Sequence, residues 1–214
     1  MKRAAKIAVV AAAHAGACLY LWRAFLQPWT IGELALGLLA GHIFLDLLTL
    51  LIHWTVDNYF TPASPVIGST VYYFREHHDK AFEMFNRDYV EGNFRNAGFS
   101  LLIQLGMAAW VTGCAGNAGM AVAGLGGAYI TQIHKWAHMK QPPRPIALVQ
   151  RARLLVGWEF HNIHHADTAR HYGLYAGWFD RVFDRLRVFE TAEHIIWRLT
   201  GARAVETRLG DFTT

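Results

Sequence analysis

The chain has 214 residues, of which 53% are hydrophobic and only 17% are charged. Because globular domains usually carry about 25% charged residues, this composition argues against a disordered, fibrous or nucleic-acid-wrapping protein. Histidine is unusually frequent, with twelve copies against sixteen Asp plus Glu. The two cysteines, Cys18 and Cys114, lie in apolar stretches and cannot form a disulfide framework or a thiolate metal site. Any metal bound by this chain would therefore have nitrogen and oxygen ligands.

The first apolar stretch covers residues 7–26 and follows the basic sequence MKRAAK. About 20 apolar residues suffice to cross a hydrocarbon core of about 30 Å, whereas the apolar region of a signal peptide has about 7 to 15. We therefore predict an N-terminal transmembrane helix within residues 1–27, with a cleaved signal peptide as the alternative.

Three further apolar stretches lie at about residues 31–52, 97–111 and 118–133. Glycines recur in the last of these, at Gly119 and Gly124 among others, and no strand precedes them. Close helix packing explains them better than a dinucleotide-binding loop does. The sequence predicts an all-α integral membrane protein with about four transmembrane helices.

Two other segments have amphipathic character. Residues 146–160 are apolar but interrupted by Gln150, Arg151 and Arg153, which favours a helix lying at the membrane interface. Residues 191–199 form a second short amphipathic pattern that predicts a helix used for structural packing.

The lysines and arginines are distributed unevenly along the chain. Three precede the first span, one lies in the first turn, four lie between the second and third spans, and twelve follow the fourth. Because cytoplasmic segments carry an excess of these residues, we expect both termini and the histidine-rich regions 53–95 and 134–214 to be cytoplasmic. The net positive charge then reflects topology, and no nucleic-acid partner is predicted.

Histidines recur at ligand-like spacings. His134 and His138 are four residues apart, so both imidazoles project from one face of a helix. His161, His164 and His165 repeat this arrangement at offsets of three and four. Such spacing is typical of residues that share a metal ion.

The remaining grouped histidines lie earlier in the chain. His77 and His78 are adjacent, hence about 100° apart on a helix, and would serve two ions more naturally than one. His53 follows the second span, and Asp57 lies one turn further on. With the groups above, this gives eight expected ligands: His53, His77, His78, His134, His138, His161, His164 and His165.

Eight imidazoles are too many for one ion with three or four protein ligands, but they suit two six-coordinate ions. An open, all-imidazole dinuclear site favours iron and oxygen chemistry, with copper as an alternative.

Several polar residues are expected to support this site. Asp46 lies within an apolar span, where a carboxylate costs roughly 2.5 kcal/mol or more unless it has a partner. We expect Asp46, Asp57 and Glu76 to orient ligating histidines, by accepting a ring N–H, or to handle protons. A direct metal bond from Asp46 is the alternative. Whether His42 and His171 assist the site, His171 as a further ligand or a proton relay, is left open.

The ordered motifs resemble a known family. They are Asp46, HWxxD from His53, REHH at 75–78, RDYVE at 87–91, QxHKWAH at 132–138, and HxxHH from His161 followed by GW at 177–178. Together they resemble the plasmanylethanolamine desaturases (Kua and CarF proteins) and their chloroplast relatives, which put a trans double bond into phospholipid-bound palmitate.

The resemblance implies a single lipid desaturase domain over residues 28–214, in which the eight histidines bind two iron ions. It also implies desaturation of a phospholipid alkyl or acyl chain with O2 as co-substrate. No carrier fingerprint is visible, so electrons would come from a separate ferredoxin or cytochrome. Because the ligands cluster at the interface, the double bond should lie near the headgroup end of the chain.

Two departures from the ether-lipid branch bear on the substrate. Arg87 and Phe160 stand where that branch has histidines, and both look closer to the chloroplast-type branch. Ether and acyl lipids therefore both remain open as substrates. The competing functions are a di-iron lipid hydroxylase and a membrane metal transporter, the latter disfavoured because only His42 and Asp46 lie at depth.

Overall fold

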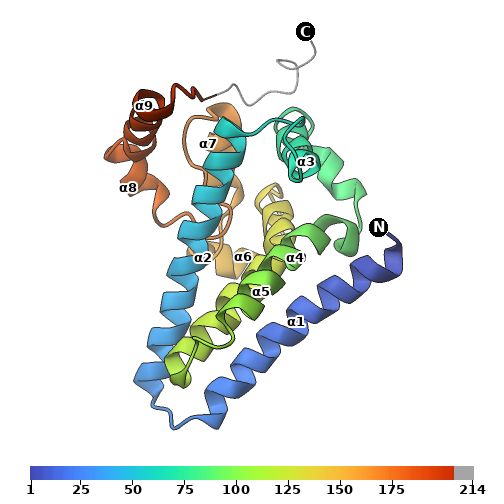
Figure 1. The fold of residues 1–214 in the computed structure, drawn as a ribbon, viewed down its shortest axis with the longest axis vertical. Helices are drawn as coiled ribbons and strands as arrows, with labels where there is room; N and C mark the ends of the chain where they lie inside the picture. Colours follow the sequence, from blue (N-terminus) through green and yellow to red (C-terminus); the bar gives the residue numbers. More distant parts are fainter. Residues whose placement is uncertain (205–214) are drawn as a thin grey trace. The chain divides into compact units, whose positions relative to one another are not determined.

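A computed structural model describes residues 1–204, and these residues are helical throughout their regular structure, with no strand (Figure 1). The all-α prediction is thus confirmed for the described part of the chain. The last ten residues of the predicted 28–214 domain lie outside it. The elements are α1 (Arg3–Leu26), α2 (Ile31–Tyr59), α3 (Gly68–Asp79), the 3-10 helix η1 (Ala81–Asn86), α4 (Tyr89–Met107), α5 (Gly113–Ala137), α6 (Arg144–Arg151), α7 (Trp158–Ala166), α8 (Asp180–Arg185) and α9 (Val188–Thr200).

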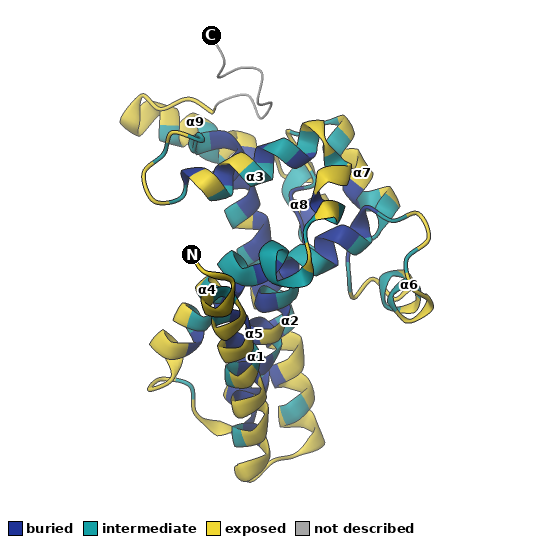
Figure 2. Ribbon diagram, turned by 90° about the vertical axis from the view of Figure 1, so that its right-hand side faces the viewer, coloured by how far each residue is buried: buried dark blue, intermediate teal, exposed yellow. Residues whose placement is uncertain are grey.

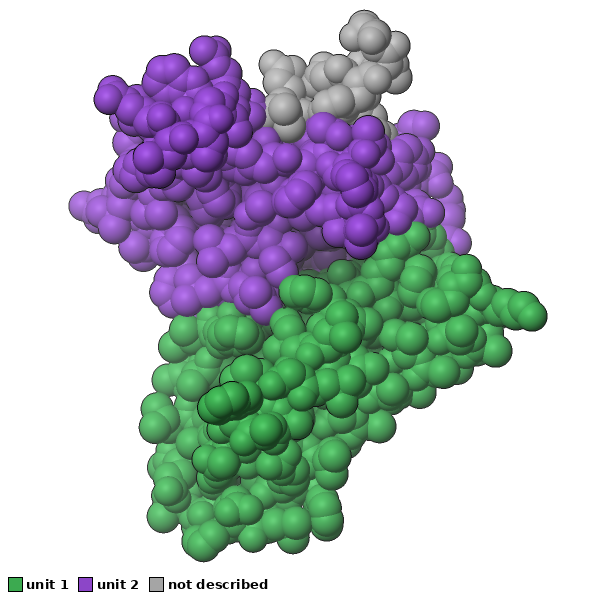
Figure 3. All heavy atoms as spheres, in the orientation of Figure 1, with its two compact units in different colours: residues 1–45, 87–133 green, residues 46–86, 134–214 purple. Residues whose placement is uncertain are grey.

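Contacts divide the chain into two compact units, coloured separately in Figure 3. Unit 1 contains residues 1–45 and 87–133, and unit 2 contains residues 46–86 and those from 134 onward. Helices α2 and α5 each begin in unit 1 and end in unit 2.

Unit 1 is a bundle in which small residues let helices approach closely. A Cβ added at Gly37 or Gly41 of α2 would collide with the backbone of α5 at Ala115 or Gly119. Helices α1 and α4 also pack together, around Ala13 and Ala97 among others. The predicted role of glycine in close helix packing is confirmed at Gly119.

Two helices have the length and composition needed to cross a membrane. They are α1, with a mean hydropathy of 1.6 over its best window, and α2, with 2.1. Only 22% and 33% of these windows are buried, whereas the core helix of a soluble protein would be mostly buried. Figure 2 shows the exposed residues along α1 and the first half of α2. Two of the four expected spans therefore qualify by length and composition.

The third and fourth expected spans do form helices, as α4 and α5. Neither is among the helices of the described chain that pass the same test of length and hydropathy. Polar residues such as Asn93 and Gln104 in α4, and the many glycines of α5, lower the apolar content of these helices. Four transmembrane helices therefore remain a prediction.

The expected continuous helix over 146–160 is wrong. Helix α6 ends at Arg151, and a bend follows in which Arg153 adopts a left-handed φ of 58°. The Gln150 side chain donates a hydrogen bond to the Val156 carbonyl at 2.9 Å and fixes this bend. The expected helix at 191–199 is confirmed within α9, which ends at Thr200 and is capped by Gly201 with φ +74°.

The core of unit 2 packs α9 against the end of α2. Trp54 and Phe189 stack with ring centroids 5.0 Å apart, and Leu50 and Tyr172 complete the buried cluster. This packing holds the segment that contains Tyr172 beside α2.

Candidate metal centre

All eight expected histidine ligands lie in unit 2, where they form two groups with one carboxylate. Within each group one ligand atom per residue lies within 4.8 Å of every other. The first group, here called the five-histidine group, contains His77, His134, His138, His161 and His165. The second, here called the carboxylate group, contains His53, Asp57, His78 and His164.

Helical spacing explains how the groups divide. His161 and His165 are four apart on α7 and enter the five-histidine group, while His164 turns toward the carboxylate group. The adjacent His77 and His78 of α3 also separate, as an angle of about 100° per residue predicts.

Four rings of the five-histidine group approach one another through their Nε2 atoms. Those of His134, His138 and His161 form a triangle with edges of 2.7, 3.1 and 3.2 Å, and His165 Nε2 lies 3.1 Å from that of His161. One ring nitrogen can direct a proton at only one neighbour, so hydrogen bonds cannot account for all these approaches. Imidazole nitrogens that approach one another this closely would fit a set of ligands for one cation, which their lone pairs would share.

The environment keeps these rings neutral, which is the form that binds metal. Burial lowers the pKa of His138 to about 4 and that of His165 to about 3. Burial first, and then neighbouring imidazoles, hold the pKa of His77 and His161 well below the usual value. Neutral imidazoles offer a lone pair to a metal at neutral pH.

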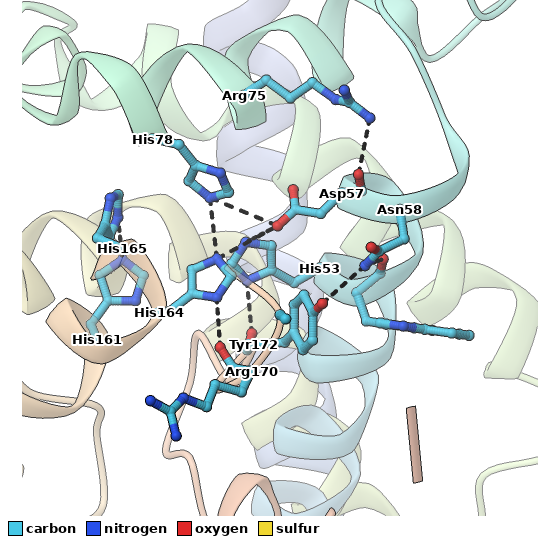
Figure 4. Close-up of polar contacts among 12 residues, drawn as sticks. His53, Asp57, Asn58, Arg75, His78, His161, His164, His165, Arg170 and Tyr172 are labelled. Atoms are coloured by element: carbon cyan, nitrogen blue, oxygen red, sulfur yellow. Dashed lines mark hydrogen bonds and ion pairs between the residues drawn. The ribbon is translucent and has the colours of Figure 1, made fainter. Parts of the chain in front are cut away.

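In the carboxylate group, Asp57 lies among ring nitrogens (Figure 4). Its Oδ2 is 3.1 Å from His53 Nε2, 3.5 Å from His164 Nε2 and 3.7 Å from His78 Nε2. Within the described chain, both Asp57 oxygens and His53 Nε2 are buried without a hydrogen-bond partner. Buried polar atoms left in this state fit a ligand set that a cation would complete.

Backbone carbonyls orient two of these rings. His53 Nδ1 donates to the Tyr172 carbonyl at 2.7 Å, and His164 Nδ1 donates to the Arg170 carbonyl at 2.8 Å (Figure 4). In a neutral ring the proton on Nδ1 leaves the Nε2 lone pair facing Asp57. Asp57 was expected to accept a ring N–H. In these tautomers the Nδ1 protons of His53 and His164 go to backbone carbonyls instead. The Asp57 oxygen then lies beside Nε2 lone pairs, in the position of a further metal ligand.

Asp46 also differs from its expected role. It is fully buried, and its carboxylate accepts backbone N–H groups from Ala176 and Gly177 at 2.8 Å and from Trp178 at 2.9 Å. These three bonds satisfy the buried charge with backbone donors rather than with a histidine ring. Asp46 therefore anchors the segment that follows Tyr172.

The other expected helpers lie outside both groups. Glu76 accepts a hydrogen bond from the Tyr72 hydroxyl at 3.2 Å. His171 Nδ1 lies 2.7 Å from a carboxylate oxygen of Asp184, and His171 has a left-handed φ of 59°. His42 belongs to unit 1.

Sequence reasoning missed two residues that brace the site. Arg75 is fully buried on α3 and donates to the carbonyls of Asp57 at 2.9 Å and Phe60 at 2.6 Å, at the end of α2. Asp180 accepts the Gly173 N–H at 2.7 Å. Arg75 could have been suspected from its place in REHH, whereas nothing local marks Asp180.

The geometry agrees with comparisons to known proteins. A sequence-family model described as the lipid desaturase domain matches residues 42–207 of the chain. The chain is 30% identical to plasmanylethanolamine desaturase from Myxococcus xanthus over 77% of this chain and 61% of that protein. It is 29% identical to chloroplastic fatty acid desaturase 4 from Arabidopsis thaliana, over 80% of this chain and 54% of the relative.

A third relative is plasmanylethanolamine desaturase 1 from Mus musculus, 26% identical over 78% of this chain and 66% of that protein. The matched region thus spans roughly half to two thirds of these relatives. No solved structure matches the chain.

Proposed function

The chain belongs to the lipid desaturase domain family, and from this premise we propose that it is a membrane enzyme that desaturates a phospholipid alkyl or acyl chain. The observation that carries the proposal is the pair of ligand groups built from eight histidines and Asp57. The double bond would form near the headgroup end of the lipid chain. The substrate would be an ether lipid, as the names of two relatives suggest, or an acyl lipid.

Two iron ions fit the two groups, because imidazole and carboxylate ligands suit iron and no thiolate is present in either group. Bound iron would supply the activation of O2 and the removal of two hydrogens from adjacent carbons. The balanced reaction takes one O2, two electrons and two protons, and yields the alkene and two waters. A separate ferredoxin or cytochrome would provide the electrons.

The chain's own residues hold and orient the ligands. The Tyr172 and Arg170 carbonyls accept the Nδ1 protons of His53 and His164, so that in the neutral rings the Nε2 lone pairs would be available to a metal. Arg75 ties α3, which carries His77 and His78, to the end of α2. Burial of the rings excludes water from around the ligand atoms.

For the membrane arrangement, we propose four spans with both termini and the site in the cytoplasm. Nineteen of the twenty lysines and arginines would then lie on that side, and only Arg23 would lie on the other.

The test is lipidomics of cells that express the wild type, His164→Ala or His194→Ala, with iron quantified in each purified protein. His194 is exposed on α9 and serves as the matched control. We expect a lipid species lighter by two hydrogens, and about two irons per chain, for the wild type and the control but not for His164→Ala. A product heavier by one oxygen would identify a hydroxylase, and equal iron in all three would refute the site.

A further inference from the structure

A cationic groove lies on unit 2 beside the metal centre. It has a volume of about 700 Å³ and is lined by α6, the bend that follows it, the first turns of α7 and residues 176–178. Four basic side chains line it, Lys140, Arg151, Arg153 and Arg181, against one acidic side chain, Glu159. All four are exposed, and within the described chain none forms an ion pair with a carboxylate.

The walls of this groove are fixed in place. Arg153 adopts a left-handed φ of 58°, a strained conformation for a residue with a side chain. The Trp178 indole N–H donates to the Arg153 carbonyl, and Gln150 holds the bend through Val156. Such strain is retained only where surrounding contacts enforce it.

The groove shares two elements with the metal centre. Phe160 and Ile163 of α7 line the groove, while His161 and His164 of the same helix enter the ligand groups. Ala176, Gly177 and Trp178 also line it, and these are the residues whose N–H groups Asp46 accepts. A ligand in the groove would therefore contact the helix that carries three of the eight histidines.

The surroundings match a lipid better than a protein. Leu148 on α6 is 63% exposed and Leu154 in the bend is 44% exposed, both close in sequence to Arg151 and Arg153. Exposed leucines next to arginines on a short amphipathic helix are typical of a membrane interface. Trp158 and Trp178 in the groove wall have the apolar ring and polar N–H that favour the same location.

We propose that this groove binds the phosphate of an anionic membrane phospholipid through Lys140, Arg151, Arg153 and Arg181. Arginine suits phosphate because its planar fork can donate two parallel hydrogen bonds. That the bound lipid is also the substrate rests on the proposed function; the binding itself does not.

Binding is tested on the full-length protein in an uncharged detergent, by native mass spectrometry with dioleoylphosphatidylglycerol. We expect Arg151→Gln/Arg153→Gln to bind about 30-fold more weakly than the wild type. Lys140→Gln/Arg181→Gln, on other parts of the lining, should show a similar loss. The charge-matched control is Arg185→Gln/Arg198→Gln, whose exposed side chains lie outside the groove and should leave binding unchanged.

Competition identifies the ligand. Dioleoylglycerol, which lacks phosphate, should not displace the lipid, and inorganic phosphate should do so only at far higher concentration. Equal loss in the control, unchanged binding in both groove variants, or displacement by micromolar phosphate would overturn the proposal. The proposal would also be overturned if the groove variants still bound the lipid but no longer bound an acidic ferredoxin. The groove would then be a docking site for a protein. Because no turnover is measured, failure here is distinct from failure of the desaturase proposal.

Discussion

The five-histidine group and the carboxylate group hold their rings by different means. In the carboxylate group, two Nδ1 atoms donate to backbone carbonyls of one segment, at 2.7 and 2.8 Å. In the five-histidine group, His161 Nδ1 has no hydrogen-bond partner within the described chain, and the rings pack edge to face on one another. One group thus depends on the segment from Arg170 to Trp178, and the other on helix spacing and ring packing.

The groups also differ in charge. Asp57 brings one negative charge to the carboxylate group, whereas the five-histidine group has five neutral ligands. A cation in the first of these environments is partly neutralised by its own ligand. The two ions should therefore be lost independently: changes to Asp57 or to the segment from Arg170 to Trp178 should remove the ion of the carboxylate group and leave that of the five-histidine group.

The largest expected effect is that of Asp57→Asn. The change keeps the shape of the side chain but removes the charge among His53, His78 and His164. We expect iron to fall from about two ions per chain to about one, and lipid desaturation to fall at least about 100-fold, the upper end of the range for weakened metal environments. Elemental analysis and lipid mass spectrometry measure both.

The control is Asp79→Asn, an exposed aspartate at the end of the same helix as His78. It should keep both irons. Loss of both irons in Asp57→Asn would mean that the two groups do not load independently.

A smaller effect is expected for Asp46→Asn. The amide keeps one acceptor oxygen but turns its NH2 toward a backbone N–H that now donates to the carboxylate. Loss of charge-assisted hydrogen bonds in a buried site should cost about 3 kcal/mol, or about 6–12 °C in Tm for a chain of this size. Iron affinity of the carboxylate group should fall about tenfold because the segment that carries the Tyr172 carbonyl loosens.

Thermal unfolding and iron titration of the purified protein check the Asp46 prediction. Equal loss of iron from the five-histidine group would show that the two groups do not depend on different segments of the chain.

The sequence predicted the parts of this site that depend on local spacing. Two histidines four apart share a face wherever the helix packs, so the pair on α7 and the pair His134 and His138 at the end of α5 follow from spacing alone. The partition of the eight histidines depends on contacts between helices distant in the chain, and spacing suggested it only for His77 and His78.

The interactions that orient the rings could not be predicted, because every residue has a backbone carbonyl and the residue type does not show which one accepts a hydrogen bond. Nothing in the sequence at Arg170 or Tyr172 indicates that their carbonyls accept from histidines. The apolar span marks Asp46 as a carboxylate that needs partners, but it does not reveal that these partners lie about 130 residues later in the chain. The break after α6 was missed for a similar reason, since Arg153 gives no glycine or proline signal for its left-handed φ.

The smallest expected effect concerns Asp180, which holds the same segment at Gly173. Burial raises the pKa of this carboxyl to about 7, far above its value in an unfolded chain. Between these two values the native state binds more protons than the unfolded state, so this residue's contribution to stability falls as the pH rises through about 7. From about pH 6 to about pH 8 the loss is about 1.4 kcal/mol.

Asp180→Asn keeps the acceptor for Gly173 but cannot ionise. Relative to the wild type, its Tm should therefore rise by about 3–6 °C between those two pH values, while titration of the remaining groups cancels in the difference. Thermal unfolding of both proteins at each pH measures this change. A difference that stays constant with pH would show that Asp180 titrates as an ordinary carboxyl. The segment that orients His53 and His164 would then be held by a charged Asp180 carboxylate at both pH values. The contribution of Asp180 to stability would then not change between them.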